Sequence, residues 1–302
     1  MSTDDNIQHG SGSEVDEVSG METTGHTWDG LKELNTPLPR WWLWTFYATV
    51  IWGLAYTIAY PAWPLVSSAT KGVLGYSTRG AVEQSISDAR AAQSDKIDRI
   101  AELSLEEIKT DEDLLRYAVA GGKSAYLVNC SQCHGSGAAG GTIYPNLNDD
   151  DWIWGGTLEA IETTLKHGIR YSLDEETRVS EMPAFGADEV LSREEIEKTA
   201  EHVLALAGLE HDAALAAEGA APYEENCAAC HGEAGEGNQE LGAPALNDAI
   251  WLYGGERDAV ISQISKPKQG VMPGWQSRLD PTTIKQLALY VHGLGGGESS
   301  AQ

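Results

Sequence analysis

One stretch of the chain is apolar without interruption: twenty residues from Trp41 to Tyr60 carry no charged side chain. As an α-helix rising 1.5 Å per residue, this stretch would be about 30 Å long, which matches the hydrocarbon thickness of a bilayer. We therefore expect one transmembrane helix at about 41–60 within a membrane anchor at 26–65, with a buried core helix as the alternative. Aromatic rings, which favour the membrane interface, stand at both ends: Trp41, Trp42 and Trp44 at the start, and Tyr60 and Trp63 at the close.

The residues before the anchor are polar. Residues 1–25 are mostly Ser, Gly, Asp and Glu, with too few large apolar groups to offset the entropy of ordering. We expect a disordered cytoplasmic leader there. A cleaved signal peptide is disfavoured, because a long polar segment precedes the apolar stretch and Trp-rich flanks replace a small-residue cleavage site.

A charged region with helical periodicity follows the anchor. Ser104 and Glu107 have the spacing of a capping box, which opens a further helix. Residues 66–112 are therefore predicted to form a periplasmic helical linker. The apolar positions that recur at helical spacing are Val82, Ile86, Ala89, Ile97, Ile100 and Leu103.

The rest of the chain contains an internal repeat, which predicts two copies of one domain at 113–209 and 210–296, with a disordered tail at 297–302. The first copy has about nine extra residues around 170–178, for which a surface loop is the simplest interpretation. Matching positions are Gly122, Tyr126, Asn129 and Cys130 with Gly219, Tyr223, Asn226 and Cys227, then Pro145–Asp149 with Pro244–Asp248, and Met182-Pro183 with Met272-Pro273.

Each copy closes with a capped helix. Ser192 with Glu195 caps the first closing helix, and Asp280 followed by Pro281 caps the second. No segment of these repeats alternates polar and apolar residues over the length of a β-strand, so the helical pattern has no competitor.

Composition narrows the possible partners. The chain has 20 Lys and Arg against 46 Asp and Glu, a formal net charge of -26. This balance argues against a nucleic-acid partner and favours cationic proteins or general solubility.

All four cysteines fall in two Cys-x-x-Cys-His motifs, Cys130 to His134 and Cys227 to His231. A zinc site would have to unite pairs that lie 227 − 130 = 97 residues apart, and a thioredoxin-like pair would need a βαβ context. The following His favours covalent haem c, with thioethers at Cys130, Cys133, Cys227 and Cys230 and with His134 and His231 as proximal iron ligands. Each repeat then has the order of elements of the all-α cytochrome c fold.

Methionine supplies the second iron ligand in this interpretation. Met1 and Met21 lie in the leader, which leaves Met182 and Met272, each before Pro and at equivalent repeat positions. Met182 is assigned to the haem of His134 because each repeat should be a complete unit, although a tandem could exchange these loops. His167, His202 and His292 are weaker candidates.

Filled axial positions leave no open site for oxygen or peroxide, so the expected task is electron transfer. Nearby aromatic residues would wall the haem pockets and keep them dry. They are Trp152, Trp154, Phe185, Trp251, Tyr253 and Trp275.

From His26 to Leu294, the chain resembles the di-haem FixP or CcoP subunit of cbb3-type cytochrome c oxidases. The resemblance is carried by specific segments around the anchor, the linker and the first motif. They are His26–Gly30, Leu34–Trp42, Tyr60–Pro64, Ser104–Ile108 and Leu114–Gly122.

The resemblance implies a non-catalytic electron-relay subunit with two covalent haem c groups. A donor cytochrome c would supply electrons, which would pass to a mono-haem cytochrome c subunit and then to the haem-copper catalytic subunit that reduces oxygen. The chain would cross the bacterial inner membrane once, with the N-terminus cytoplasmic and the haem domains periplasmic, because thioether attachment takes place outside the membrane. The expected fold class is all-α: one N-terminal transmembrane helix followed by two tandem cytochrome c-like domains.

Two other functions stay open. One is a free-standing, membrane-anchored di-haem cytochrome serving another respiratory enzyme. The other is a di-haem peroxidase, which would need one haem with an open or displaceable ligand.

Overall fold

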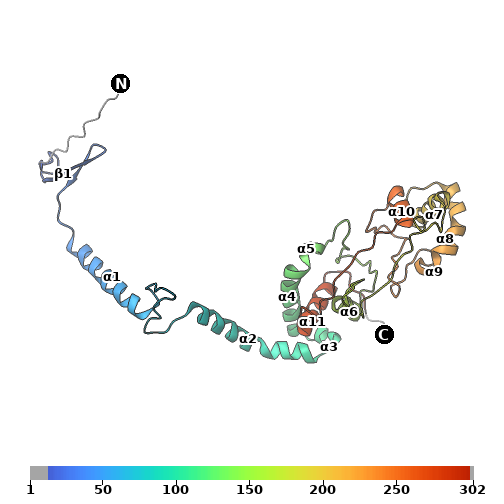
Figure 1. Ribbon diagram of the computed structural model, residues 1–302, viewed down its shortest axis with the longest axis horizontal. Coiled ribbons are helices and arrows are strands. Elements are labelled where there is room, and N and C mark those ends of the chain that lie inside the picture. The colour runs from blue at the N-terminus through green and yellow to red at the C-terminus, as the bar shows by residue number, and fades with distance from the viewer. Residues whose placement is uncertain (1–12, 300–302) are drawn as a thin grey trace, which may run out of the picture. The chain divides into compact units, whose positions relative to one another are not determined.

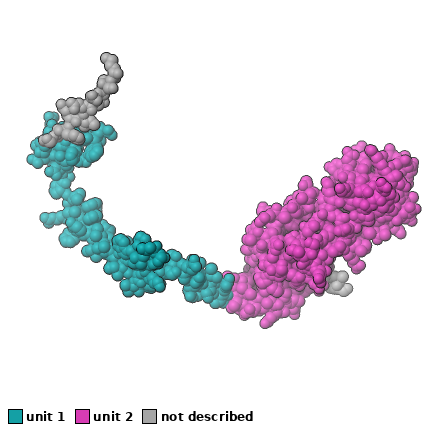
Figure 2. All heavy atoms as spheres, viewed as in Figure 1, with its two compact units in different colours: residues 1–91 teal, residues 92–302 magenta. Residues whose placement is uncertain are grey.

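The chain, taken from a computed structural model that describes residues 13–299, folds as two compact units, residues 1–91 and 92–302 (Figure 2). Residues 1–12 of the predicted leader and residues 300–302 of the predicted tail lie outside the described residues.

The first unit begins with a small antiparallel hairpin of β1 (Thr23–Trp28) and β2 (Leu31–Leu34). Asp29 and Gly30 join the strands with φ of 48° and 84°, the left-handed pair that a tight hairpin turn requires. Val15 and Glu22 form an isolated bridge just before it. The chain is therefore mostly helical but not all-α, and residues 13–25 of the predicted disordered leader have defined backbone pairing.

Helix α1 (Arg40–Ala59) occupies the predicted anchor. None of its residues is buried within the chain. Trp, Tyr and Thr recur along α1 and lower its mean hydropathy. The helix is therefore less apolar than a typical transmembrane span. Across residues 13–299, no helix combines the length and the apolar character that crossing a bilayer requires.

The predicted linker is helical. It contains α2 (Thr78–Glu102) and α3 (Leu105–Thr110). The capping box is confirmed, since the Ser104 hydroxyl accepts from Glu107 N–H at 3.3 Å and the Glu107 carboxylate accepts from Ser104 N–H at 2.8 Å. Ile100 and Ile108 are fully buried in the core described next.

The second unit holds both repeats. The predicted caps are present: Ser192 with Glu195 forms a capping box, and Asp280 accepts from Thr283 N–H at 3.0 Å. Its further helices are α4 (Glu112–Asn129), α5 (Ser131–His134), α6 (Leu158–His167), α7 (Arg193–Leu206), α8 (Ala213–Asn226), α9 (Ala228–His231), α10 (Arg257–Ser265) and α11 (Pro281–His292).

The helices of the two repeats pair with each other across the repeats. The opening helix α4 packs against α11, which closes the second repeat, and α8 packs against α7, which closes the first (Figure 1). Helix α6 also packs on α11, and α10 packs on α7. We call α3, α4, α5, α6 and α11 the first module, and α7, α8, α9 and α10 the second module.

Two hydrophobic cores follow this pairing. The first core joins Leu114 and Tyr126 of α4 to Ile284 and Leu287 of α11. The second core joins Ile196 of α7 to Tyr223 of α8 and to Val260 and Ile264 of α10. The structure thus differs from the prediction that each repeat forms one complete unit.

A glycine lets each pair of helices approach closely. A Cβ on Gly122 would collide with the backbone carbonyl of Gln286, and a Cβ on Gly219 would collide with that of Lys198. Lys198 and Gln286 stand at the same position relative to their N-caps, so both crossings use one geometry. This glycine contact is therefore the same at both crossings and does not by itself determine which closing helix meets which opening helix.

The end of the chain is bonded to the first module. The Trp152 indole N–H donates to Gly296 O at 2.6 Å. Gly156 N–H donates to the Glu298 carboxylate at 2.7 Å, and Glu298 N–H donates to Gly156 O at 2.9 Å. The tail that the sequence predicts to be disordered is therefore hydrogen-bonded to the first module as far as Glu298.

Candidate haem-binding sites

Each Cys-x-x-Cys-His motif forms one short helical turn directly after an opening helix. Cys130 ends α4 and begins α5, and His134 N–H donates to Cys130 O at 3.0 Å. Cys227 ends α8 in the same way, and His231 N–H donates to Cys227 O at 2.9 Å. The repeated sequence therefore builds the same turn twice, with a thiol at its start and an imidazole at its end.

A buried tyrosine fixes each turn to its helix. The Tyr126 hydroxyl donates to Gly135 O at 2.8 Å, and the Tyr223 hydroxyl donates to Gly232 O at 2.8 Å. Burial raises the pKa of both phenols to about 12, so each remains a hydrogen-bond donor. The sequence repeat identifies these tyrosines as matching positions, but it does not predict that their hydroxyls bond to the haem-binding turns.

Each motif histidine is oriented by a proline carbonyl. His134 Nδ1 lies 3.1 Å from Pro145 O, and His231 Nδ1 lies 2.9 Å from Pro244 O. A carbonyl oxygen only accepts, so Nδ1 carries the proton and the Nε2 lone pair is available for a metal. Burial lowers the pKa of both imidazoles, which favours the neutral ligand form. These contacts explain the repeated Pro-containing segment that follows each motif.

The first thiol of each motif is protonated. Burial raises the pKa of Cys130 and of Cys227 to about 11. A reactive thiolate is therefore disfavoured at both positions, which argues against a thioredoxin-like redox pair.

The second motif faces Met182 across a cavity. Met182 lines the same cavity as Cys227, Cys230 and His231. The remaining walls are largely aromatic and aliphatic: Phe185, Val203, Tyr223, Trp251, Val260 and Ile264 are among them. An imidazole nitrogen, a thioether sulfur and two thiols around an apolar cavity match the donors and surroundings of a haem c.

The first motif shares its core with Met272. Met272 and Cys130 both pack against the hydrophobic cluster that contains Tyr126, together with Leu147 and Trp152. Met272 belongs to the second repeat, so the exchange of helices also exchanges the methionines. Met182, which repeat integrity assigns to His134, lines instead the cavity of the motif that ends at His231.

The other predicted wall residues divide between the two modules. Phe185, Trp251 and Tyr253 line the cavity of the second motif. Trp154 lies beneath the Arg178 guanidinium, 5.5 Å from it. Trp275 lies against the Arg278 guanidinium at 5.5 Å.

The three histidines considered as substitute ligands have other contacts. His202 packs on Tyr223, with ring centroids 5.1 Å apart, at the crossing of α7 and α8. His292 Nε2 lies 2.9 Å from Glu298 O. His167 Nδ1 lies 3.3 Å from the Asp174 carboxylate.

The two Cys-x-x-Cys-His turns have oriented histidines, and one shares a cavity with Met182 while the other shares a hydrophobic core with Met272. These are the residue types that a di-haem c-type cytochrome requires. Comparison with known families agrees. The model described as "N-terminal domain of cytochrome oxidase-cbb3, FixP" matches residues 20–67, and the model described as "Cytochrome C oxidase, cbb3-type, subunit III" matches residues 118–203 and 214–291.

Full-length relatives point to the same family. The chain is 54% identical to the cbb3-type cytochrome c oxidase subunit FixP of Rhizobium meliloti (strain 1021), covering 94% of this chain and 98% of the relative. It is 52% identical to the subunit CcoP of Cereibacter sphaeroides, covering 91% and 95%. It is 50% identical to FixP of Azorhizobium caulinodans, covering 99% and 100%. The chain belongs to the FixP/CcoP family of cbb3-type cytochrome c oxidase subunits.

Proposed function

We propose that this chain is the electron-relay subunit of a cbb3-type terminal oxidase and carries two covalently attached haem c groups. It takes electrons from a donor cytochrome c and passes them towards the mono-haem subunit and the haem-copper catalytic subunit. The observation that carries this proposal is the apolar cavity that His231, Cys227 and Cys230 share with Met182, supported by the core on which both Cys130 and Met272 pack. The net charge of -26 suits a cationic donor protein.

Each haem would be held by four residues of this chain. Cys130 and Cys133 would form the thioethers of the first haem, with His134 and Met272 as its axial ligands. A haem iron held between a His nitrogen and a Met sulfur exchanges single electrons without an open coordination position.

The second haem would use the corresponding residues of the second module. Cys227 and Cys230 would form its thioethers, and His231 and Met182 would be its axial ligands. The Pro244 carbonyl keeps the proton of His231 on Nδ1, 2.9 Å away, so the imidazole coordinates in one orientation. Apolar walls exclude water and disfavour the extra charge of the oxidised site.

The proposal also places α1 in the bacterial inner membrane, crossed once, with the N-terminus cytoplasmic and both haem modules periplasmic. Support comes from its length of 20 residues, about 30 Å as a helix. After Arg40 it carries no charged side chain, and it buries no residue within the chain.

Labelling of single cysteines with a membrane-impermeant maleimide tests this topology. S68C should react in intact spheroplasts, and S19C should react only after lysis. Reaction of both positions in intact spheroplasts would contradict the proposed orientation.

Purification from detergent-solubilised membranes tests the assignment to an oxidase. A tagged chain should bring with it a haem-copper subunit that consumes oxygen when reduced cytochrome c is supplied. Isolation of the chain alone, with both haems attached, would instead support a free-standing di-haem cytochrome.

Optical spectroscopy separates a relay from a peroxidase. Both haems of the oxidised chain should show the long-wavelength charge-transfer band of a Met-ligated iron. A high-spin signal, or turnover of peroxide by the isolated chain, would support the peroxidase alternative.

A further inference from the structure

The extra residues of the first repeat contact both methionine-bearing segments. Ile169, just before them, pairs with Met272 through two backbone hydrogen bonds: Ile169 N–H donates to Met272 O at 2.9 Å, and Met272 N–H donates to Ile169 O at 3.0 Å. The two ends of the insertion are joined, since Arg170 N–H donates to Arg178 O at 2.8 Å. The insertion is therefore a closed surface loop whose base is hydrogen-bonded to the segment that carries Met272.

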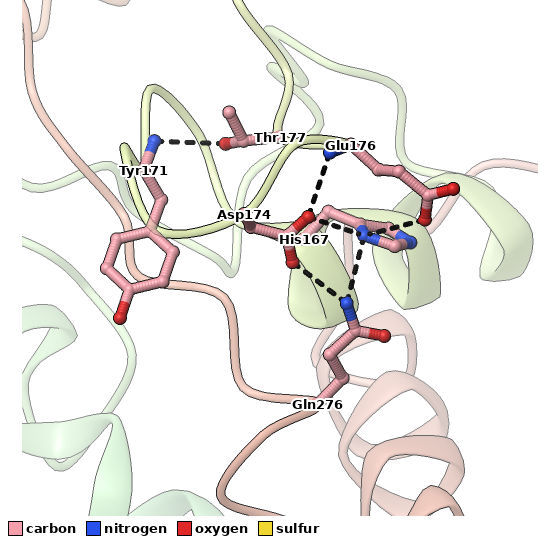
Figure 3. Close-up of polar contacts among 6 residues, drawn as sticks. All are labelled: His167, Tyr171, Asp174, Glu176, Thr177 and Gln276. Atoms are coloured by element: carbon pink, nitrogen blue, oxygen red, sulfur yellow. Dashed lines mark hydrogen bonds and ion pairs between the residues drawn. The ribbon is translucent and has the colours of Figure 1, made fainter.

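A second attachment lies beyond the methionine. The Asp174 carboxylate accepts from the Gln276 side-chain amide at 2.8 Å and from Glu176 N–H at 2.9 Å, and it lies 3.3 Å from His167 Nδ1 (Figure 3). The Asp174 side chain is only 11% exposed, although its partners Glu176 and Gln276 lie at the surface. Met272 is thus flanked by an attachment at its own backbone and another at Gln276.

Arg170 connects this loop to the other methionine segment. Its Nε donates to Gly270 O at 2.7 Å, and its Nη1 donates to Ser180 O at 2.9 Å. Gly270 stands two residues before Met272, and Ser180 stands two residues before Met182. One planar guanidinium therefore bridges the two segments, which a single ammonium group could not do with the same geometry.

The backbone conformation and the location of Arg170 also distinguish it from an ordinary surface arginine. Arg170 has a φ of 51°, a left-handed conformation that non-glycine residues rarely adopt. Arg170 also lines the cavity of the second motif, beside Met182. The Gln269 side chain adds a parallel link, since its Nε2 donates to Met182 O at 3.0 Å.

We infer that Arg170 is a positioning residue for both axial methionines: together with the Gln269 link, it holds the Met182 and Met272 segments in register, so that one arginine side chain acts on both haem sites. The inference rests on the proposed His/Met ligation. Asp174 has a narrower role, because it contacts only the Met272 side.

The test measures the Met-to-iron charge-transfer band and carbon monoxide binding in the purified full-length chain with both haems attached. R170Q should reduce the total band intensity of both haems. It should also raise the fraction that binds carbon monoxide roughly tenfold, the factor expected for losing one charge-assisted hydrogen bond to each segment. R170K, which keeps the charge but not the fork, should give an intermediate loss.

Two variants define the comparison. R193Q makes the same charge change at a side chain that is 92% exposed and should leave both bands intact. D174N should reduce only the band of the first haem, which contributes about half of the total band intensity. R170Q values equal to those of R193Q, or a loss confined to the same haem as in D174N, would overturn the inference. A parent chain with no such band on either haem would instead refute the proposed ligation.

Discussion

The substitution Gly122→Ala tests the crossing of α4 on α11. Alanine is favoured over glycine in a helix interior by about 1 kcal/mol, so the change would stabilise an isolated α4. At this crossing, however, the new Cβ meets the backbone carbonyl of Gln286, which cannot rotate away as a side chain could. Overpacking typically costs about 1–3 kcal/mol, and a collision with a backbone carbonyl places this case at the upper end, about 2–3 kcal/mol. We expect a net loss of about 1–2 kcal/mol.

The neighbouring residue provides the control. A Cβ on Gly121 meets only the end of the Gln286 side chain, which can move. G121A should therefore be neutral or slightly stabilising in the same helix. Thermal unfolding followed by far-UV circular dichroism should show G122A melting about 2–8 °C below the parent, at about 2–4 °C per kcal/mol for a unit of this size. A G122A melting temperature equal to or above that of G121A would refute the close packing of α4 on α11.

Three further changes test individual contacts. R257Q leaves the Glu201 carboxylate, which is 1% exposed, without its 2.6 Å ion pair. Because the arginine is half-exposed, the change should lower the free energy of unfolding by only about 1–3 kcal/mol. Urea unfolding measures this loss, and an unchanged free energy would mean that the pair is not formed. Y223F removes the 2.8 Å hydrogen bond to Gly232 O and should cost about 1 kcal/mol in the same assay, and a gain in stability would contradict it. Burial, followed by neighbouring carboxylates, raises the pKa of Asp151 to about 6, so this residue lowers the stability of the folded chain as pH rises from about 4 to 6. D151N should therefore unfold at higher urea concentration than the parent at pH 8 but not at pH 4, and equal midpoints at both pH values would show that Asp151 titrates normally.

Local structure follows closely from the sequence. The caps at Ser104, Ser192 and Asp280 form as their spacing predicts, because each depends only on residues within one helical turn. The two motif turns and the positions of their histidines are equally local. What each repeat contains was therefore predictable.

The pairing of the repeats was not predictable in the same way. Gly122 and Gly219 make the same approach to a closing helix, and Gln286 and Lys198 accept it at equivalent positions. Sequence periodicity describes each face but not which copy it meets. The choice depends on the lengths and contacts of the segments that connect the helices, including the inserted loop at 170–178.

The N-terminal hairpin shows a different kind of miss. The dipeptide Asp29-Gly30 is by itself a strong signal for a tight hairpin turn. The prediction instead placed both residues in the membrane anchor at 26–65 and assigned no turn there. Strand pairing in β1 and β2 is local, so this element could have been found from the sequence.

The exchange of methionines is tested most directly in chains that carry one haem. In a C130A/C133A chain, only the haem at Cys227 and Cys230 remains. This double variant is the reference, and it must itself show the Met-to-iron band. Adding M182A should abolish the band and open the iron to carbon monoxide, whereas adding M272A should leave the band in place. Loss of the band with M272A and its survival with M182A would contradict the exchanged ligation.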